Sequence, residues 1–217
     1  MIDAVEQAMK IIGKDGCEPS YFKVVISSTA DHKGFERREK LTALLTAADI
    51  KPTVFDLCPP YNPKSESTTT GCNAYRGCDL HFADIIKKYK DQNIIYLEDD
   101  AYFDKELLAS LTRDLNELTD YAPSWQIFIP GHCSRSEGKT VAPRIFSPSW
   151  WILGTQCIVL KAGSWVDDLH EAIVSRNIYS LRPGEYKNNA GFDSVLLHWC
   201  KDNDVKAYVA EEPYVWQ

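Results

Sequence analysis

The sequence predicts an α/β fold with a mostly parallel central sheet flanked by helices. Segments with the apolar character of buried strands alternate along the chain with segments of helical periodicity, and this alternation is typical of parallel sheets built from strand–helix–strand units. The 217 residues, 44% of them hydrophobic and 25% charged, can bury a core and favour a single domain over residues 1–217. We expect this domain either to stand alone or to belong to a longer, multi-domain chain.

The first half of the chain is expected to hold three helices and three strands. Ile2, Val5, Met9 and Ile12 recur at helical spacing, which predicts an amphipathic helix at the N-terminus. The segment 58–71 is rich in Pro, Ser and Thr and is the clearest loop. The other expected elements are a strand at 21–28, a helix at 35–48, a short strand at 51–57, a helix at 73–90 and a strand at 93–98.

The second half is expected to add three helices and three strands. Asp104 precedes the first of these helices and is placed to cap it. The segment 132–149 is polar and interrupted by Pro, so it is expected to be a loop. The expected elements are a helix at 104–118, strands at 125–131 and 150–160, helices at 164–174 and 191–200, and a strand at 205–211.

Charge and cysteine content narrow the function classes. With 24 basic and 31 acidic residues the net charge is −7, which disfavours nucleic acid or an anionic membrane as the main partner. The apolar run at the N-terminus is too short for a membrane span or a signal peptide. Seven Cys residues without a CxxC pair favour reduced, mostly buried thiols and a cytoplasmic protein.

Polar side chains follow three of the expected strands where each ends. These are the segment Ser27–Thr29, the residue Asp56 and the acidic triplet Glu98–Asp100. Ligands of parallel α/β sheets bind at the carboxyl ends of the strands, so the three ends are expected to meet at one site. For Asp56 alone, an ordinary turn residue at a strand end is an equally good interpretation.

The acidic triplet is the most informative of the three ends. Side chains alternate along a strand, so Glu98 and Asp100 are expected to point together while Asp99 turns the other way. Hard carboxylate oxygens suit Mg²⁺ or Mn²⁺, which take their remaining ligands from water and from substrate phosphates. The alternative interpretation is a solvated acidic turn.

Several motifs resemble one enzyme family. The strand that ends in Glu98–Asp100 and continues to Phe103, and the pair KVVISS and FERREKL, resemble the small glycosyltransferases of the GT-A fold. The likeness is to the group (family 25) of lipopolysaccharide-biosynthesis and procollagen galactosyltransferases. Further matching segments are Gly71–Arg76, Leu153–Gly163 and Gly191–Leu196; Tyr75-Arg76 stands where that group has Ser-His, and Cys157 where it has Ala.

The resemblance implies a single GT-A (Rossmann-like) domain that moves a sugar from a nucleotide donor, a UDP-sugar, to a hydroxyl of a glycan or other acceptor, with inversion. It implies Mn²⁺ or Mg²⁺ on the donor diphosphate. It also implies Asp193 as the catalytic base. The implied metal ligands are Asp100, Glu98 and His198, and the implied nucleotide-sugar contacts are Ser27, Ser28, Thr29, Asp56, Arg76, Glu98 and Asp99.

Some of these residues have a plain structural alternative. Asp193 can simply cap the helix that follows it, and His198 can be a packing residue between Leu197 and Trp199. The pair Asp167-Asp168 is a weaker candidate for the base, because carboxylates in a first helical turn complement the helix dipole. Trp150-Trp151 is expected either to stack on a sugar or to lie in the core, with the segment 132–149 as a lid.

Two other function classes remain open from the sequence. The first is another divalent-metal enzyme acting on phosphates, such as a nucleotidyltransferase or a phosphoesterase. It would need a phosphate-binding glycine-rich loop early in the chain, and the TADHKG turn is a poor version of one. The second is a non-catalytic carbohydrate-binding domain, which the intact carboxylates disfavour.

Overall fold

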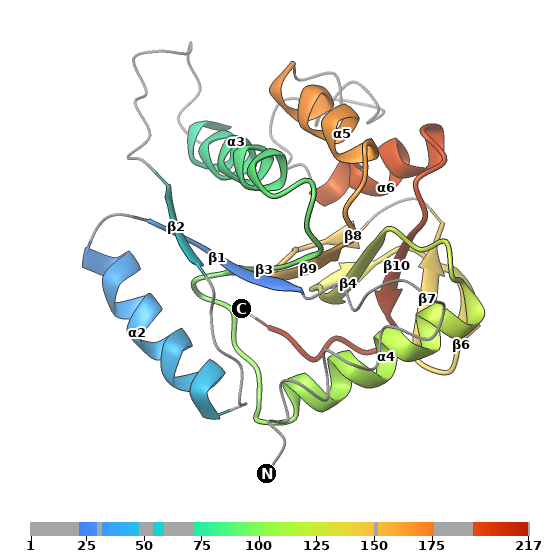
Figure 1. The fold of residues 1–217 in the computed structure, drawn as a ribbon, viewed down its shortest axis with the longest axis horizontal. Helices are drawn as coiled ribbons and strands as arrows, with labels where there is room; N and C mark the ends of the chain where they lie inside the picture. Colours follow the sequence, from blue (N-terminus) through green and yellow to red (C-terminus); the bar gives the residue numbers. More distant parts are fainter. Residues whose placement is uncertain are drawn as a thin grey trace.

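An eight-stranded sheet with helices on both faces forms the body of the computed structural model, which describes residues 22–29, 32–47, 54–58, 72–149, 152–175 and 193–216. Helices α3, α5 and α6 cover one face, and helices α2 and α4 cover the other (Figure 1). The helix expected at the N-terminus lies outside the described residues. The helices are α2 (His32–Ala47), α3 (Cys72–Lys88), α4 (Leu107–Tyr121), α5 (Trp165–Val174) and α6 (Asp193–Asp202).

The strands of the large sheet lie in the order β2-β1-β3-β9-β4-β10-β7-β6, and β5 pairs with β8 in a separate two-stranded sheet. Their bounds are β1 (Lys23–Thr29), β2 (Val54–Cys58), β3 (Ile94–Glu98), β4 (Ile127–Gly131), β5 (Ser134–Arg135), β6 (Gly138–Ala142), β7 (Ile145–Pro148), β8 (Ile152–Leu153), β9 (Cys157–Leu160) and β10 (Ala207–Ala210).

Most strands of this sheet run in one direction, as the sequence predicted. Strands β2, β1 and β3 are mutually parallel, as are β4 and β10. Strand β9 is antiparallel to both β3 and β4, and β7 is antiparallel to both β10 and β6. Within the described residues, β9 and β7 are therefore the two reversed strands, and the other six share one direction.

The sheet separates two apolar clusters, because neighbouring residues of a strand face opposite sides. Val25 and Tyr96 pack toward α3, α5 and α6, whereas Ile26 and Leu97 pack toward α2 and α4. Full burial of such side chains stabilises a fold by about 1.5–3 kcal/mol each. Helix α4 shows the pattern clearly, with its buried leucines at helical spacing: Leu107, Leu111, Leu115 and Leu118.

Two expected elements differ from the structure. The segment 132–149 was expected to be a loop, which is wrong in part: β6 and β7 form a hairpin that extends the sheet at its edge. Most of β6 is exposed, so it lacks the apolar alternation of a strand with one buried face. The strand expected at 150–160 is divided into β8 and β9 by Gly154, whose φ of +75° breaks the extended backbone.

The start of α4 is close to its expected place. The Asp104 carboxylate accepts a hydrogen bond from the Glu106 N–H at 2.8 Å, and the Leu107 N–H donates to the Asp104 carbonyl. Asp104 therefore satisfies backbone groups just ahead of the first helical residue, although the capping position itself is Glu106.

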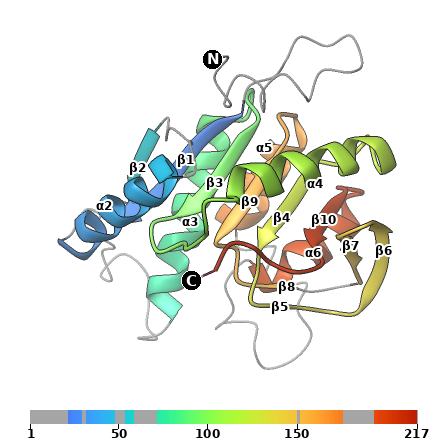
Figure 2. The same cartoon turned by 90° about the horizontal axis from the view of Figure 1, so that it is seen from below.

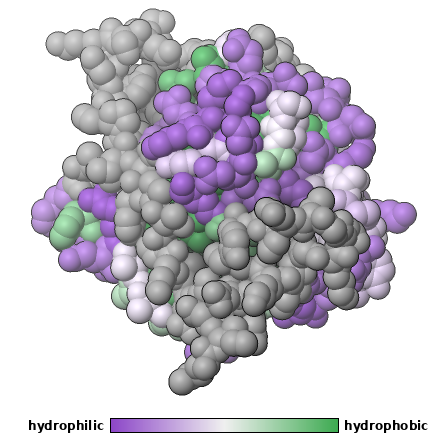
Figure 3. Space-filling view, in the orientation of Figure 1, coloured by the Kyte–Doolittle hydropathy of each residue, from purple (hydrophilic) through white to green (hydrophobic). Residues whose placement is uncertain are grey.

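In the view of Figure 3, the surface that the described residues form over α3 and α5 is mostly hydrophilic. No helix among the described residues has the length and apolar character needed to cross a membrane. Four cysteines have described side chains, and all four are free thiols: Cys157 and Cys200 are buried, whereas Cys78 and Cys133 are exposed.

Candidate functional site

The ends of β2, β1 and β3 lie level with one another at one edge of the sheet. Ser27 is the register partner of Asp56 on β2 and of Glu98 on β3. Because Ser27 and Glu98 follow Val25 and Tyr96 by two residues, both point to the α3 side of the sheet. The convergence of strand ends expected from the sequence is therefore present in the backbone.

Glu98 lies within a group of carboxylates. It is largely buried, and burial together with Asp100, then Asp193, Asp99 and Asp79, raises its pKa from 4.5 to about 8. These residues come from three parts of the chain: the turn after β3, the start of α6 and the middle of α3. Burial is the largest cause of this raised pKa, and the nearby carboxylates raise it further because they repel the ionised form of Glu98.

Asp193 is held at this edge by a backbone contact. It is the first residue of α6, and its Oδ2 accepts a hydrogen bond of 2.7 Å from the Gly154 N–H. Gly154 combines a positive φ with tight surroundings, since a Cβ at this position would lie 2.8 Å from the Cys133 Sγ. The break between β8 and β9 therefore presents the N–H that fixes the carboxylate.

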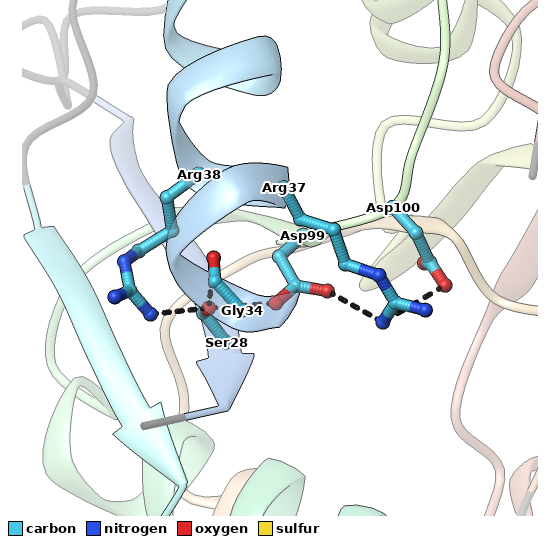
Figure 4. Close-up of polar contacts among 6 residues, drawn as sticks. All are labelled: Ser28, Gly34, Arg37, Arg38, Asp99 and Asp100. Atoms are coloured by element: carbon cyan, nitrogen blue, oxygen red, sulfur yellow. Dashed lines mark hydrogen bonds and ion pairs between the residues drawn. The ribbon is translucent and has the colours of Figure 1, made fainter. Parts of the chain in front are cut away.

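Asp99 turns to the opposite side of the sheet, as the alternation predicted. Figure 4 shows its carboxylate between Ser28 and Arg37, on the side of the sheet that α2 covers. The buried Ser28 hydroxyl donates to Asp99 Oδ2 at 2.6 Å and accepts a hydrogen bond from Arg38 at 2.8 Å. Arg37 Nη1 lies 3.3 Å from Asp99 Oδ1 and 3.5 Å from Asp100 Oδ2.

This network fixes the acidic turn to helix α2. Asp99 is only 7% exposed, and its two oxygens contact Ser28 and Arg37, so the structure places both Ser28 and Asp99 in the support of the turn. Asp100 is more open, with 24% of its side chain exposed. Arg37 therefore ties both aspartates of the turn to α2, while Asp100 also lies close enough to Glu98 to raise its pKa.

The carboxylate oxygens of this site suit a hard divalent cation that takes few of its ligands from the protein. Glu98, Asp100 and Asp193 offer carboxylate oxygens, and their mutual repulsion favours a bound cation. Among the residues with described side chains, however, no group of three or more His, Cys, Asp or Glu is arranged around one ion position. Mg²⁺ commonly takes one or two carboxylates from the protein and completes its shell with water and substrate phosphates.

Other expected site residues have separate surroundings. His198 is half-buried between Leu197 and Trp199. It lies five residues after Asp193, and because a helix turns by about 100° per residue, the two side chains face different sides of α6. Asp167 pairs with Lys87 of α3 and with Lys90 just after this helix, so it joins α5 to the end of α3. The side chains of Thr29, Asp56 and Arg76, and the pair Trp150-Trp151, lie outside the described part of the chain.

Two residues of the cluster were not singled out from the sequence. Asp79 is 5% exposed on α3 and contributes to the raised pKa of Glu98. A signal was present, because Asp79 precedes the buried Phe82 and Ala83 by three and four residues, which puts a carboxylate on the buried side of the helix. Arg37 lies in the helix expected at 35–48, but its contact with Asp99 was not predictable from the local pattern.

A cavity of about 580 Å³ lies elsewhere in the described structure. It is bordered by the second half of α6, by the β6–β7 hairpin and by the start of β10, with Lys201, Lys139 and Tyr208 among its lining residues. Strand β10 begins here, so the cavity lies toward the opposite edge of the sheet from Glu98.

Comparisons with known proteins show similarity in fold. No family model matches the chain, and no curated protein matches it in sequence. A crystal structure of a glycosyltransferase involved in glycosylation of the major capsid of PBCV-1 is 10% identical, with a TM-score of 0.50 over 90% of this chain and 94% of its own. A UDP-glucose pyrophosphorylase complexed with UDP-glucose is 11% identical, with a TM-score of 0.48 over 97% of this chain and 77% of its own. The first of these likenesses confirms the predicted α/β fold of the GT-A, Rossmann-like type, and at such identity it shows the fold alone.

Proposed function

We propose that this protein is a metal-dependent glycosyltransferase that moves a sugar from a nucleotide donor, a UDP-sugar, to a hydroxyl group of a glycan. The observation that carries the proposal is the convergence of Glu98, Asp100 and Asp193 at the carboxyl edge of the sheet, where the pKa of Glu98 is raised to about 8. The glycosyltransferase that shares this fold supports the same reaction class.

Glu98 and Asp100 are the proposed ligands of Mn²⁺ or Mg²⁺. When bound, such a cation stabilises the negative charge that the nucleoside diphosphate gains as the glycosidic bond breaks. The two carboxylates can hold it on the α3 side of the acidic turn, and Arg37 fixes the turn from the other side. His198 remains a proposed third ligand that would need the donor-bound enzyme to bring it closer.

Asp193 is the proposed general base. It is half-buried at the start of α6, where the Gly154 N–H donates to its Oδ2 and fixes the carboxylate, and a carboxylate fixed near the metal ligands is suited to accept a proton from an attacking hydroxyl. A base that acts directly on the acceptor hydroxyl leads to inversion at the sugar carbon. Membership of the galactosyltransferase group named above is proposed on the sequence motifs.

The nucleoside is proposed to lie along the ends of β1 and β2. Ser27 is directed to the same side as Glu98, and the register brings Asp56 level with both. Thr29 and Arg76 are proposed to complete the contacts, with Arg76 near the diphosphate. Ser28 and Asp99 are reassigned to the support of the turn, because they contact each other and α2.

Donor hydrolysis tests the proposal without a known acceptor. The purified chain is incubated with Mn²⁺ and a panel of UDP-sugars, and the products are separated by ion-exchange chromatography. Slow release of UDP and free sugar from at least one donor is expected, because water can replace the missing acceptor. Release of UMP and a sugar phosphate would indicate attack at phosphorus instead, and would favour the nucleotidyltransferase or phosphoesterase alternative.

A further inference from the structure

A pair of exposed aromatic rings lies next to the acidic turn. Tyr102 follows Asp100 by two residues, and Trp216 comes from the segment after β10. The two backbones are joined by reciprocal hydrogen bonds: the Tyr102 N–H donates to the Trp216 carbonyl at 2.7 Å, and the Trp216 N–H donates to the Tyr102 carbonyl at 2.8 Å. Segments more than a hundred residues apart are therefore fixed together beside the proposed metal ligands.

The rings face solvent although their neighbours are buried. Tyr102 is 57% exposed and Trp216 is 40% exposed, whereas Phe103 and Val215 beside them are fully buried. The ring centroids lie 6.2 Å apart, with 40° between the ring planes. The buried neighbours and the paired backbones fix the main chain at both residues, so the exposure of the two rings follows from the fold.

The pair lies across the turn from the proposed donor site. Phe103 and Val215 belong to the apolar cluster on the α2 and α4 side, whereas Ser27 and Glu98 face α3. Figure 2, which views the molecule from the side of α2 and α4, shows the segment after β10 passing in front of the sheet toward the end marked C. The backbone that carries the two rings is therefore packed on the α2 and α4 side, two residues from Asp100, whereas the proposed nucleotide contacts face α3.

We propose that Tyr102 and Trp216 form a stacking platform for a sugar ring of the acceptor glycan. The inference rests on the proposed glycosyltransferase function and names the acceptor class. A pyranose ring presents an apolar C–H face that suits exposed aromatic rings, and its hydroxyls can hydrogen-bond to a polar rim. Arg37, which pairs with Asp100 two residues before Tyr102 and is itself partly exposed, supplies such a rim.

Fluorine NMR of protein labelled with fluorotryptophan tests the platform directly. The resonance that disappears in Trp216→Phe is assigned to Trp216. Protein saturated with UDP and Mn²⁺ is then titrated with methyl glycosides of glucose, galactose, mannose, xylose and N-acetylglucosamine. We expect at least one glycoside to shift the Trp216 resonance in a saturable manner and to leave the resonances of the other five tryptophans in place.

Matched variants show whether a loss of glycoside affinity comes from the stacking platform or from a general effect on the protein. Tyr102→Ala should weaken the glycoside affinity about fivefold to tenfold, the loss expected for one aromatic contact, and should leave the UDP affinity unchanged. Tyr121→Ala is the control, because Tyr121 is 62% exposed at the far end of α4. It should change neither affinity.

Two results would overturn the inference. In one, no glycoside shifts the Trp216 resonance although UDP binds. In the other, UDP with Mn²⁺ shifts that resonance by itself and Tyr102→Ala weakens UDP, which would mean that the rings stack on the nucleobase. A protein that binds no UDP at all would instead contradict the proposed function, so the two failures are distinguishable.

Discussion

Replacing Glu98 with Gln tests whether burial and the neighbouring carboxylates raise the pKa of Glu98 in the folded protein. Burial and the neighbouring carboxylates of Asp100 and Asp193 raise the pKa of Glu98 from 4.5 to about 8. In the unfolded chain these neighbours disperse, and the group titrates near its ordinary pKa. The folded metal-free protein therefore holds a proton on Glu98 at a pH where the unfolded chain has released it.

The sign of the pH effect follows from this difference. Because the folded pKa is higher, the stabilisation is complete below pH 4.5 and is lost as the pH rises through about 8. One proton held only by the folded state lowers the free energy of unfolding by up to about 1.4 kcal/mol for each pH unit. Between about pH 5.5 and about pH 7.5 the loss is at most about 3 kcal/mol.

Urea unfolding in the presence of EDTA measures this slope. Wild type should lose stability across the window, whereas Glu98→Gln, which cannot ionise, should lose far less. Glu171→Gln is a suitable control, because Glu171 is exposed on α5. Adding Mn²⁺ at about pH 7.5 should stabilise wild type more than Glu98→Gln, since a cation favours the ionised carboxylate. Equal slopes in wild type and Glu98→Gln would refute the reasoning.

Three further predictions concern the other carboxylates. Asp100→Asn should weaken UDP binding in Mn²⁺ by about 10- to 100-fold. The control Asp120→Asn, the same change at an exposed residue near the end of α4, should leave UDP binding unchanged. Equal UDP affinities of wild type and Asp100→Asn by calorimetry would contradict the metal role. Asp193→Asn keeps an oxygen for the Gly154 N–H, so UDP affinity should persist while the transfer rate falls by about 10²–10⁴-fold; a normal rate would exclude Asp193 as the base. Asp167→Asn breaks ion pairs to Lys87 and Lys90 at the surface and should leave the donor-hydrolysis rate unchanged; a large loss would move the base to α5.

Much of the fold was predictable because its buried strands have a strong local pattern. The strands that became β1, β3 and β4 are dense in Ile, Val and Phe, and each was expected within a few residues of its observed bounds. The hairpin of β6 and β7 was missed. Strand β6 lies at the sheet edge, and its exposed residues Gly138, Lys139 and Thr140 have the composition of a loop.

The sequence predicted the part of the candidate site that lies at the ends of the strands. Alternation along β3 correctly put Glu98 and Asp99 on opposite sides of the sheet. The contacts of Asp79, Arg37 and Trp216 depend on packing between distant segments, which local periodicity does not encode. Ser28 was assigned to the ligand because a polar strand end resembles a binding residue, whereas its hydroxyl is engaged by Asp99 and Arg38.

Calorimetric titration of UDP into the protein, once with Mn²⁺ and once with EDTA, tests the central claim most directly. If the carboxylates after β3 hold a divalent cation that in turn binds the diphosphate, UDP should bind with Mn²⁺ and lose at least about tenfold in affinity with EDTA. UDP affinity that is the same with and without the metal, or no UDP binding in either buffer, would contradict the account.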